Sequence, residues 1–297
     1  MVSRCVRELE LRIEYYTVLP SSLYTCKSLV TLRLEGYKVR VNVPGTVCLP
    51  SLKTLELQWV IYSNEDSLGL LLSCCPVLED LVIKRGQRDN VKALVVTVPS
   101  LQRLSLWIAS KCSSDGYVID TPSLKYLIVK EHRDSSSYSI KHMPKLENAH
   151  AKVGRGIDLQ KFLGSITSVK LLNTHKTLNQ DFFIGYDFSM YRAGTVFDQL
   201  EYLKLNAFKN DWSKLLVRLL NASPNLRALT LSVYGYFDDQ EQIRWSFEPS
   251  SIPKCLLKSL KTFKFKRFKG RSEERDFLSF LFKHTRCLKS SSILSSR

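Results

Sequence analysis

The sequence predicts an α/β fold: a solenoid whose repeated strand-and-turn unit builds a curved parallel sheet, with short convex helices and a strand–helix cap at the C-terminus. Two observations lead to this expectation. A leucine-rich phrase recurs at near-constant spacing over most of the chain, and from residue 245 the pattern changes to a basic alternating segment followed by a helical one. We therefore expect a repeat domain over residues 1–244 and a C-terminal domain over residues 245–297.

The recurring phrase has the form LxxLxL, as in LPSLKTLELQWV (49–60) and VPSLQRLSLWIA (98–109). Aligned on its middle leucine, the phrase occurs eleven times, and the first seven steps between anchors are 23, 23, 26, 23, 23, 22 and 23 residues. Leucine-rich repeats have a period of about 20 to 29 residues, so the spacing predicts this architecture. The anchors are Leu9, Leu32, Leu55, Leu81, Leu104, Leu127, Ala149, Leu172, Leu203, Leu229 and Phe263.

The spacing within the phrase explains the recurrence. Two leucines separated by one residue lie on one face of a strand, because side chains alternate with a period of two. One unit cannot bury its own apolar face, whereas stacked units bury a continuous core and pair their strands in parallel. The Pro-Ser pair before several of these strands marks the turn through which the chain enters the strand.

Helices are expected between some of the strands. EDSLGLLLSCC (65–75) has leucines at helical spacing, with Asn64 as its expected N-cap, and DWSKLLVRLLNAS (211–223) has a similar pattern,. SSLYTCKSL and DLQKFLGSI indicate shorter helical turns. The aromatic-rich segment 181–197 has no clear period and is interpreted as an insertion or an irregular repeat.

The residues between the core leucines should point to the concave face of the sheet. Val82, Trp107, Tyr126 and Ile128 form an apolar and aromatic group there, and charged residues such as Glu56 and Lys130 surround it. Exposed apolar groups with a charged rim are typical of protein-binding surfaces, so we expect a protein partner on this face. The alternative is that neighbouring loops cover these side chains.

The composition predicts a soluble intracellular protein, cytoplasmic or nuclear, without a signal peptide or membrane span,. Its formal net charge is +16, and residues 254–297 hold 13 Lys and Arg against 3 acidic residues. This basic C-terminal region indicates either a solvated basic face, which we favour, or a surface for nucleic acid or another anion.

Nothing in the sequence indicates catalysis, and we expect no enzyme activity, cofactor or metal site. The chain has no P-loop, GxSxG or HExxH motif, and its five histidines are scattered,. His150 and His175 are expected one repeat apart, in different columns and without a carboxylate partner. None of the eight cysteines forms a CxxC pair, so free thiols that fill the core are expected,.

The C-terminal segment contains KSLKTFKFKRF, an alternating strand with lysines that would discourage pairing at a sheet edge,. Gly270 should end this strand, and Ser272 should cap a helix with Glu273 and Glu274 in its first turn. The segment resembles the FBD domain that follows leucine-rich repeats in a large family of plant F-box proteins. The matching residues are Trp245, Pro249, Pro253, Cys255, Leu256, Leu260, Lys261, Phe263, Gly270, Glu273, Glu274 and Leu278, followed by CLKSSSI.

This resemblance covers nearly the whole chain and implies a function. In that family, the F-box binds the adaptor subunit of an SCF-type ubiquitin ligase, and the repeats are thought to hold the substrate. No F-box pattern precedes Val6, and the FBD-like segment ends early, at SSSILSSR. We therefore expect a substrate-binding arm without adaptor binding, present as a fragment, an alternative product or a non-functional remnant.

Overall fold

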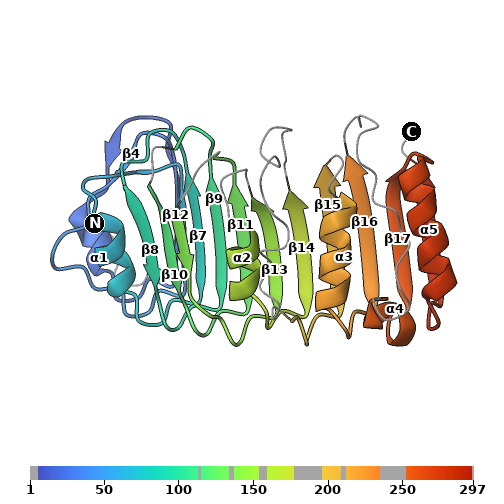
Figure 1. Cartoon of the computed structure of the whole chain (residues 1–297). Helices are drawn as coiled ribbons and strands as arrows, with labels where there is room; N and C mark the ends of the chain where they lie inside the picture. Colours follow the sequence, from blue (N-terminus) through green and yellow to red (C-terminus); the bar gives the residue numbers. More distant parts are fainter. Residues whose placement is uncertain are drawn as a thin grey trace. The chain divides into compact units, whose positions relative to one another are not determined.

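The computed structural model describes residues 6–112, 115–133, 137–153, 159–176, 196–208, 212–234 and 252–295. The chain divides into two compact units. Unit 1 comprises Met1–Leu146 and Val153–Ser165, and unit 2 comprises Glu147–Lys152 and Ile166–Arg297. Each unit contains a sheet of parallel strands arranged in chain order (Figure 1). The fold is therefore the expected leucine-rich-repeat architecture.

The long sheet of unit 1 has the strand order β1-β3-β5-β7-β9-β11. Its strands are β1 (Glu8–Arg12), β3 (Thr31–Glu35), β5 (Thr54–Gln58), β7 (Asp80–Arg85), β9 (Arg103–Ile108) and β11 (Tyr126–Glu131). Each anchor leucine lies opposite the anchor of the next repeat, from Leu9 to Leu127. From Leu32 onward, these anchors are at most 2% exposed. Full burial of a leucine contributes about 1.5–3 kcal/mol, so the repeated anchors form the core of the unit.

Unit 1 also contains two three-stranded parallel sheets that the sequence does not predict, in addition to its short helices. They are β2-β4-β6 (Thr17–Val18, Val39–Val41, Ile61–Tyr62) and β8-β10-β12 (Ala93–Thr97, Gly116–Asp120, Ser137–Ile140). These segments return the chain from one long strand to the next, and a 23-residue repeat leaves them little room for a helix. In ALVVT, Leu94 and Val96 are buried and their neighbours are exposed, as expected for a half-buried strand,.

The helices of unit 1 lie within or close to the predicted segments. They are the 3₁₀ helix η1 (Ser21–Thr25), α1 (Ser67–Ser73) and α2 (Leu159–Ser165), and α1 packs beside β8 (Figure 1). The prediction of Asn64 as the N-cap of α1 is wrong, because Asp66 occupies that position. The Asn64 carboxamide oxygen instead accepts a hydrogen bond of 2.7 Å from the Ser67 hydroxyl, so it is not available to the backbone N–H groups of the first turn.

The sheet of unit 2 has the order β13-β14-β15-β16-β17-β18. Its strands are β13 (Asn148–Val153), β14 (Leu171–Lys176), β15 (Tyr202–Phe208), β16 (Ala228–Tyr234), β17 (Thr262–Phe268) and β18 (Ser290–Ser295). The anchors Leu172, Leu203, Leu229 and Phe263 are again in register. The helix predicted over 211–223 is α3 (Trp212–Ala222), and a short helix, α4 (Lys254–Lys258), precedes β17. Most of segment 181–197 lies outside the described residues.

The C-terminal segment forms the predicted strand and helix, β17 and α5 (Ser272–His284), with two differences. Arg271, not Ser272, is the N-cap residue, since the Glu274 carboxylate reaches back to accept hydrogen bonds from the backbone N–H groups of Lys269 (2.9 Å) and Arg271 (3.2 Å). Furthermore, β17 is not an edge strand, because β18 pairs with its outer side. The expected cap is therefore a strand–helix–strand element.

An aromatic core joins α3 to this C-terminal element. Trp212 is 1% exposed, and its ring lies 6.2 Å from that of Phe265 and 5.5 Å from that of Phe277, measured between centroids. The Trp212 indole N–H also donates a 3.1 Å hydrogen bond to the Glu273 carboxylate. Phe263 and Phe265 of β17 therefore point to the face of the sheet that α3 and α5 cover. The residues that alternate with them point to the opposite, open face.

We expect Trp212→Ala to lower the free energy of unfolding by about 3–5 kcal/mol, because it opens a cavity beside the rings of Phe265 and Phe277,. Urea unfolding followed by far-UV circular dichroism measures this loss. Trp212→Phe is the matched variant, which keeps an aromatic ring but removes the N–H donor, and it should cost less. If Trp212→Ala unfolds at the wild-type urea concentration, the core does not join α3 to the C-terminal element.

Candidate protein-binding face

The side chains that alternate with the core leucines form the open face of each long sheet, which is the face the sequence predicts to be concave. In unit 1, the strand register arranges them in three rows. The start row is Glu8, Thr31, Thr54, Asp80, Arg103 and Tyr126. The central row is Glu10, Arg33, Glu56, Val82, Ser105 and Ile128. The end row is Arg12, Glu35, Gln58, Lys84, Trp107 and Lys130.

All six residues predicted for the binding patch lie on the open face of unit 1, but in different rows. Trp107 and Lys130 are direct neighbours in the end row. Val82 and Ile128 belong to the central row and have Ser105 between them, so they are two strand spacings apart, about 10 Å,. Tyr126 is in the start row, four residues and about 13 Å from Lys130 along the same strand. The six residues thus lie on the predicted face of the sheet but do not form one compact group.

Glu56 has a structural role on this face. One of its carboxylate oxygens accepts a 2.9 Å hydrogen bond from the Arg33 guanidinium, and the other accepts a 3.1 Å hydrogen bond from the Gln58 amide. The hydrogen bond and charge of Glu56 raise the pKa of Arg33 above its usual value. Because both oxygens are engaged, Glu56 orders the surface beside Val82 and offers no uncompensated charge.

Charge pairs also occupy the first repeats and the start row. Arg12 lies 2.7 Å from Glu10 and 3.6 Å from Glu35, and Arg103 forms an ion pair with Asp80. These pairs are solvent-exposed, so each contributes little stability. Opposite charges are thus paired in the first repeats. Lys84 and Lys130 lie beside Trp107 in the end row, and neither forms an ion pair with another described residue.

Trp107 belongs to a line of rings that the sequence does not predict. This aromatic row consists of Tyr37, Trp59, Trp107 and His132. The Trp59 ring stacks on Tyr37 at 5.5 Å and meets Trp107 edge-on at 4.4 Å, and Trp107 lies 5.5 Å from His132. Contacts between aromatic rings at these separations contribute about 0.5–1.5 kcal/mol beyond the area they bury.

Two backbone features make the aromatic row continuous. Trp59 directly follows β5 and has φ of 62°, a left-handed conformation that costs a bulky residue about 1–3 kcal/mol,. Gly86 follows β7, the strand between those that precede Trp59 and carry Trp107. A Cβ atom at Gly86 would lie 3.1 Å from the Trp59 ring. The absent side chain therefore leaves the space that the Trp59 ring needs to cross this repeat and contact Trp107.

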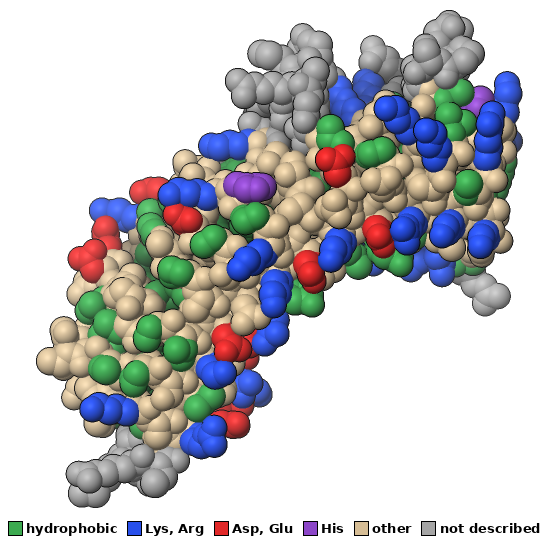
Figure 2. Space-filling view, turned by 90° about the horizontal axis from the view of Figure 1, so that it is seen from below, with side chains coloured by type: hydrophobic (Ala, Val, Ile, Leu, Met, Phe, Trp, Pro, Cys, Tyr) green, Lys and Arg blue, Asp and Glu red, His purple; other side chains and the backbone are tan. Residues whose placement is uncertain are grey.

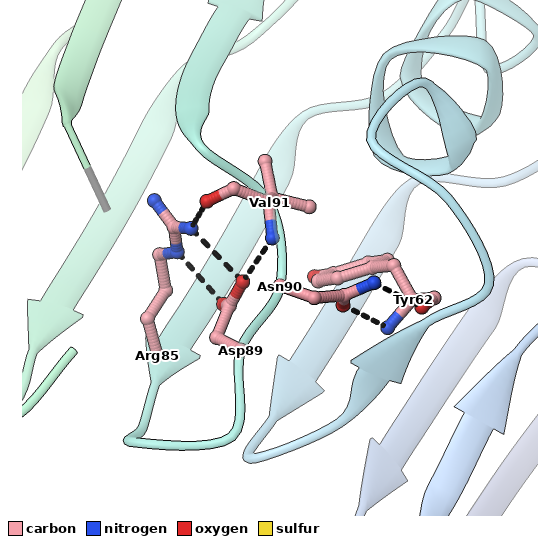
Figure 3. Close-up of polar contacts among 5 residues, drawn as sticks. All are labelled: Tyr62, Arg85, Asp89, Asn90 and Val91. Atoms are coloured by element: carbon pink, nitrogen blue, oxygen red, sulfur yellow. Dashed lines mark hydrogen bonds and ion pairs between the residues drawn. The ribbon is translucent and has the colours of Figure 1, made fainter. Parts of the chain in front are cut away.

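A buried ion pair holds the end of β7, directly beside Gly86 (Figure 3). The Arg85 guanidinium donates hydrogen bonds to both carboxylate oxygens of Asp89, at 2.7 Å and 2.9 Å, and a further one to the Val91 carbonyl. Burial acts to lower the pKa of Arg85, but the hydrogen bonds and charge of Asp89 raise it above its usual value. Arg85 thus stays charged within the core.

The same turn is tied to the neighbouring repeat by Asn90. Its side-chain carboxamide accepts a 3.0 Å hydrogen bond from the Tyr62 backbone N–H and donates one of 2.6 Å to the Tyr62 carbonyl (Figure 3). Asn90 therefore pairs with Tyr62 as a strand residue would. The segment from Arg85 to Val91 is fixed on both sides, and this fixes the position of Lys84 and Gly86 in the open face.

The candidate metal ligands and the thiols can be located among the described residues. No group of three or more His, Cys, Asp or Glu that would suit a metal occurs within the described part of the chain. All seven described cysteines are free thiols, and burial raises the pKa of Cys75 and Cys255 to about 12, so neither is a thiolate at neutral pH,. Cys26 and Cys112 are also buried, whereas Cys48 is exposed and is not the core filler expected of it.

The sequence contains only a weak signal for the missed residues. Trp107 lies at the third residue after its anchor, a regular open-face position. Trp59, Tyr37 and His132 follow their anchors by four or five residues, beyond the alternating part of the strand. The left-handed backbone at Trp59 and the glycine at position 86 allow the Trp59 ring to contact Trp107, and the repeat pattern does not indicate either feature.

The fold and the open face define the chain as a leucine-rich-repeat protein. The family model "FBD-associated F-box protein At5g56370, LRR repeats" matches residues 1–149, and the FBD model matches residues 248–293. The chain is 52% identical to FBD-associated F-box protein At5g60610 and 57% identical to putative FBD-associated F-box protein At5g56700, both from Arabidopsis thaliana. These alignments cover 98% and 99% of this chain, and 76% and 74% of the relatives.

A third relative, putative F-box/FBD/LRR-repeat protein At4g00315 of Arabidopsis thaliana, is 43% identical over 97% of this chain and 68% of its own length. The chain therefore belongs to the plant family of FBD-associated F-box proteins with leucine-rich repeats. This membership confirms the resemblance seen in the repeats and in the C-terminal segment, and it is consistent with a role in protein interaction. No described helix has the length and hydropathy that a membrane span requires.

We expect Gly86→Val to break the contact between Trp59 and Trp107, because the new side chain would occupy the space of the Trp59 ring. The near-UV circular dichroism of the tryptophan pair should fall, with a stability loss of about 1–3 kcal/mol from overpacking. Gly45→Val is the matched control, since a Cβ at Gly45 meets no atom within 4 Å. An unchanged near-UV spectrum for Gly86→Val would contradict the assigned role of Gly86.

Asp89→Ala should destabilise unit 1 by about 3–5 kcal/mol, because it leaves the Arg85 charge buried without its partner. Thermal unfolding measures the effect. The double variant Arg85→Met/Asp89→Ala removes both charges and should recover most of the loss. If the single and double variants melt at the same temperature, the uncompensated charge is not the cause of the destabilisation.

Proposed function

We propose that this chain recognises a protein through the open face of unit 1, as the substrate-binding arm of an F-box receptor of an SCF-type ubiquitin ligase. The observation that carries the proposal is the aromatic row with Lys84 and Lys130 on either side of Trp107. Membership of the FBD-associated F-box family supports it. Binding of the ligase adaptor is not part of the proposal, which concerns the repeats.

The chemistry of the face determines the kind of partner. Tryptophan and tyrosine are enriched among the residues that contribute most to protein interfaces, because they bury a large area with little loss of side-chain freedom. Trp107 and Ile128 are half-buried in the unbound chain and are already oriented by their neighbours. A partner that offers an apolar side chain to this surface and carboxylates to Lys84 and Lys130 would complement it.

The centre of the proposed interface lies between the end row and the central row. Trp107, Ile128 and Val82 supply the apolar contact. Tyr126, which is 41% exposed, extends it towards the start row. Glu56 borders the contact as part of the ordered pair with Arg33. The mechanism is therefore docking on a preformed surface, without a chemical step.

The double variant Trp107→Ala/Ile128→Ala should abolish partner binding and leave the fold intact. Loss of an interface tryptophan costs about 2 kcal/mol or more, which corresponds to at least about a thirtyfold loss of affinity. The measurement is quantitative mass spectrometry of proteins retained from a plant cell extract by the tagged chain, followed by titration of each purified candidate. Far-UV circular dichroism checks that the variant is folded.

Tyr15→Ala is the matched control, because Tyr15 is 79% exposed and lies outside the strands of the open face. It should retain the same proteins as the wild type. A partner that binds Trp107→Ala/Ile128→Ala as tightly as it binds the wild type would show that the patch is not its binding site.

A further inference from the structure

The open face of unit 2 differs in charge from that of unit 1. None of the six strands β13 to β18 contains an aspartate or a glutamate, whereas five of the six long strands of unit 1 contain at least one. The unit 2 strands instead contain lysines and histidines, together with asparagine, threonine and serine. These strands therefore contain no carboxylate that could pair with their lysines, whereas most of the charged side chains on the open face of unit 1 are paired.

The lysines are regularly spaced on this face. Lys204 of β15 and Lys264 of β17 are in register on either side of Thr230 of β16, about 10 Å apart,. Lys266 lies two residues further along β17, about 7 Å from Lys264 at the backbone. Lys204 is exposed, and the two lysines of β17 are half-buried. These three lysines form the basic face, and no ion pair joins any of them to another described residue.

Hydrogen-bonding groups without negative charge lie between the lysines. Thr230 separates Lys204 from Lys264, and Ser232 is beside Lys266 in the register. The neighbouring strand β14 fixes the orientation of the Asn206 side chain. The Asn206 amide donates hydrogen bonds to the Asn173 side chain at 3.2 Å and to the Thr174 carbonyl at 3.1 Å. Asn206 and Ser232 are buried, whereas Thr230 is half-buried, so the accessible face combines the ammonium donors with the Thr230 hydroxyl and suits the carboxylates of a bound peptide,.

A neighbouring histidine responds to the positive charge of this region. His175 of β14 is opposite Asn206 in the register. Burial lowers its pKa, and the charges of Lys152, His150 and Lys204 lower it further. The local potential is therefore positive in the absence of a ligand, and an anionic ligand on the face would act in the opposite direction and raise this pKa.

The basic surface continues to the edge where the strands begin. There, Glu147 pairs with Lys170 at 3.4 Å and Glu201 with Arg227 at 3.8 Å. The next two repeats have Lys261 and Lys289 at the equivalent position, and both are exposed. Figure 2 looks onto this edge and shows Lys and Arg side chains gathered over the C-terminal part of unit 2, where Asp and Glu side chains are few.

We propose that the basic face of unit 2 binds an acidic peptide segment of a protein, with Lys204, Lys264 and Lys266 as its carboxylate contacts. The proposal rests on charge complementarity and does not depend on the function proposed for unit 1. Alternate residues of an extended peptide are about 7 Å apart, the same spacing as Lys264 and Lys266. An extended segment with a carboxylate at every second residue therefore fits along β17.

The residues between the lysines favour a peptide ligand over nucleic acid. Proteins that bind single-stranded nucleic acid combine a basic groove with aromatic side chains on which the bases stack. On the described part of this face, Tyr202 is 50% exposed, but the ring of Tyr234 lies under the Arg267 guanidinium at 4.5 Å. The strand that carries Lys264 and Lys266 thus has its arginine engaged with a ring, and Thr230, rather than an aromatic residue, lies between Lys204 and Lys264.

The test uses the full chain and a fluorescein-labelled twelve-residue peptide of alternating glutamate and serine. Fluorescence anisotropy should show binding that weakens as salt increases. The variant Lys264→Glu/Lys266→Glu should lose at least about tenfold in affinity, because it replaces two attractive contacts by two repulsive ones. Peptide binding should also raise the pKa of His175, which NMR titration of its imidazole measures.

The matched control is Lys254→Glu/Lys258→Glu, which changes the net charge equally at exposed positions of α4, outside the sheet. It should keep most of the affinity, and equal losses in both double variants would overturn the proposal. Lys264→Gln/Lys266→Gln gives a second measurement if the charge reversal prevents folding. A thymidine oligonucleotide of twelve residues that binds more tightly than the peptide, and through the same lysines, would identify a nucleic-acid surface and overturn the proposal. Absence of peptide binding at low salt would also overturn it.

Discussion

The structure depends on strand pairing that keeps the anchor leucines level from one repeat to the next. From Leu9 to Leu127 in unit 1 and from Leu172 to Phe263 in unit 2, the anchor of one strand is opposite the anchor of the neighbouring strand, without stagger. Because the side-chain period of a strand is two, a slip of one residue would turn the leucines to solvent and bring the open-face residues into the core. The same constraint that builds the core therefore also creates the rows on the open face.

The two units use this scaffold in different ways. On the open face of unit 1, acidic and basic side chains are largely paired with each other, and the aromatic row forms one apolar feature among them. In unit 2, the strands have no carboxylates, and the lysines are separated by neutral hydrogen-bonding groups. The core is similar in both, since leucine or phenylalanine occupies nearly all the anchor positions. The difference lies entirely in residues that do not determine the fold.

Much of the fold could be predicted from the sequence, because the LxxLxL pattern reports directly on strand position, facing and pairing. The short return strands such as Ala93–Thr97 were not predicted, since five residues between turns give little periodicity to distinguish them from loop. The helix N-caps lie one or two residues from the predicted Ser272 and Asn64. The Asn64 side chain accepts a hydrogen bond from Ser67 instead, and the Glu274 carboxylate binds the backbone N–H of Arg271, so the presence of a good capping residue does not fix the cap position. The proposed domain boundary between residues 244 and 245 stays a prediction.

The candidate site was predictable only where it follows the alternation. Val82, Trp107, Ile128 and Lys130 are at regular open-face positions, so their facing followed from the repeat. The contact between Trp59 and Trp107 depends on a left-handed residue after a strand and on a missing side chain one repeat away. Both are properties of backbone conformation and space, which the identity of neighbouring residues in the sequence does not reveal.

The in-register rows have a consequence for how such a surface can change. Each repeat contributes one side chain to each row, so the open face resembles a grid with one coordinate along the strand and the other along the chain. Replacing one residue alters a single point of the grid and leaves the core leucines untouched. Gly86 shows that a missing side chain can matter as much as one that is present, because it lets the ring of Trp59, after β5, contact the ring of Trp107 two strands away in β9. Recognition by this fold can therefore diversify through both the side chains it presents and those it omits.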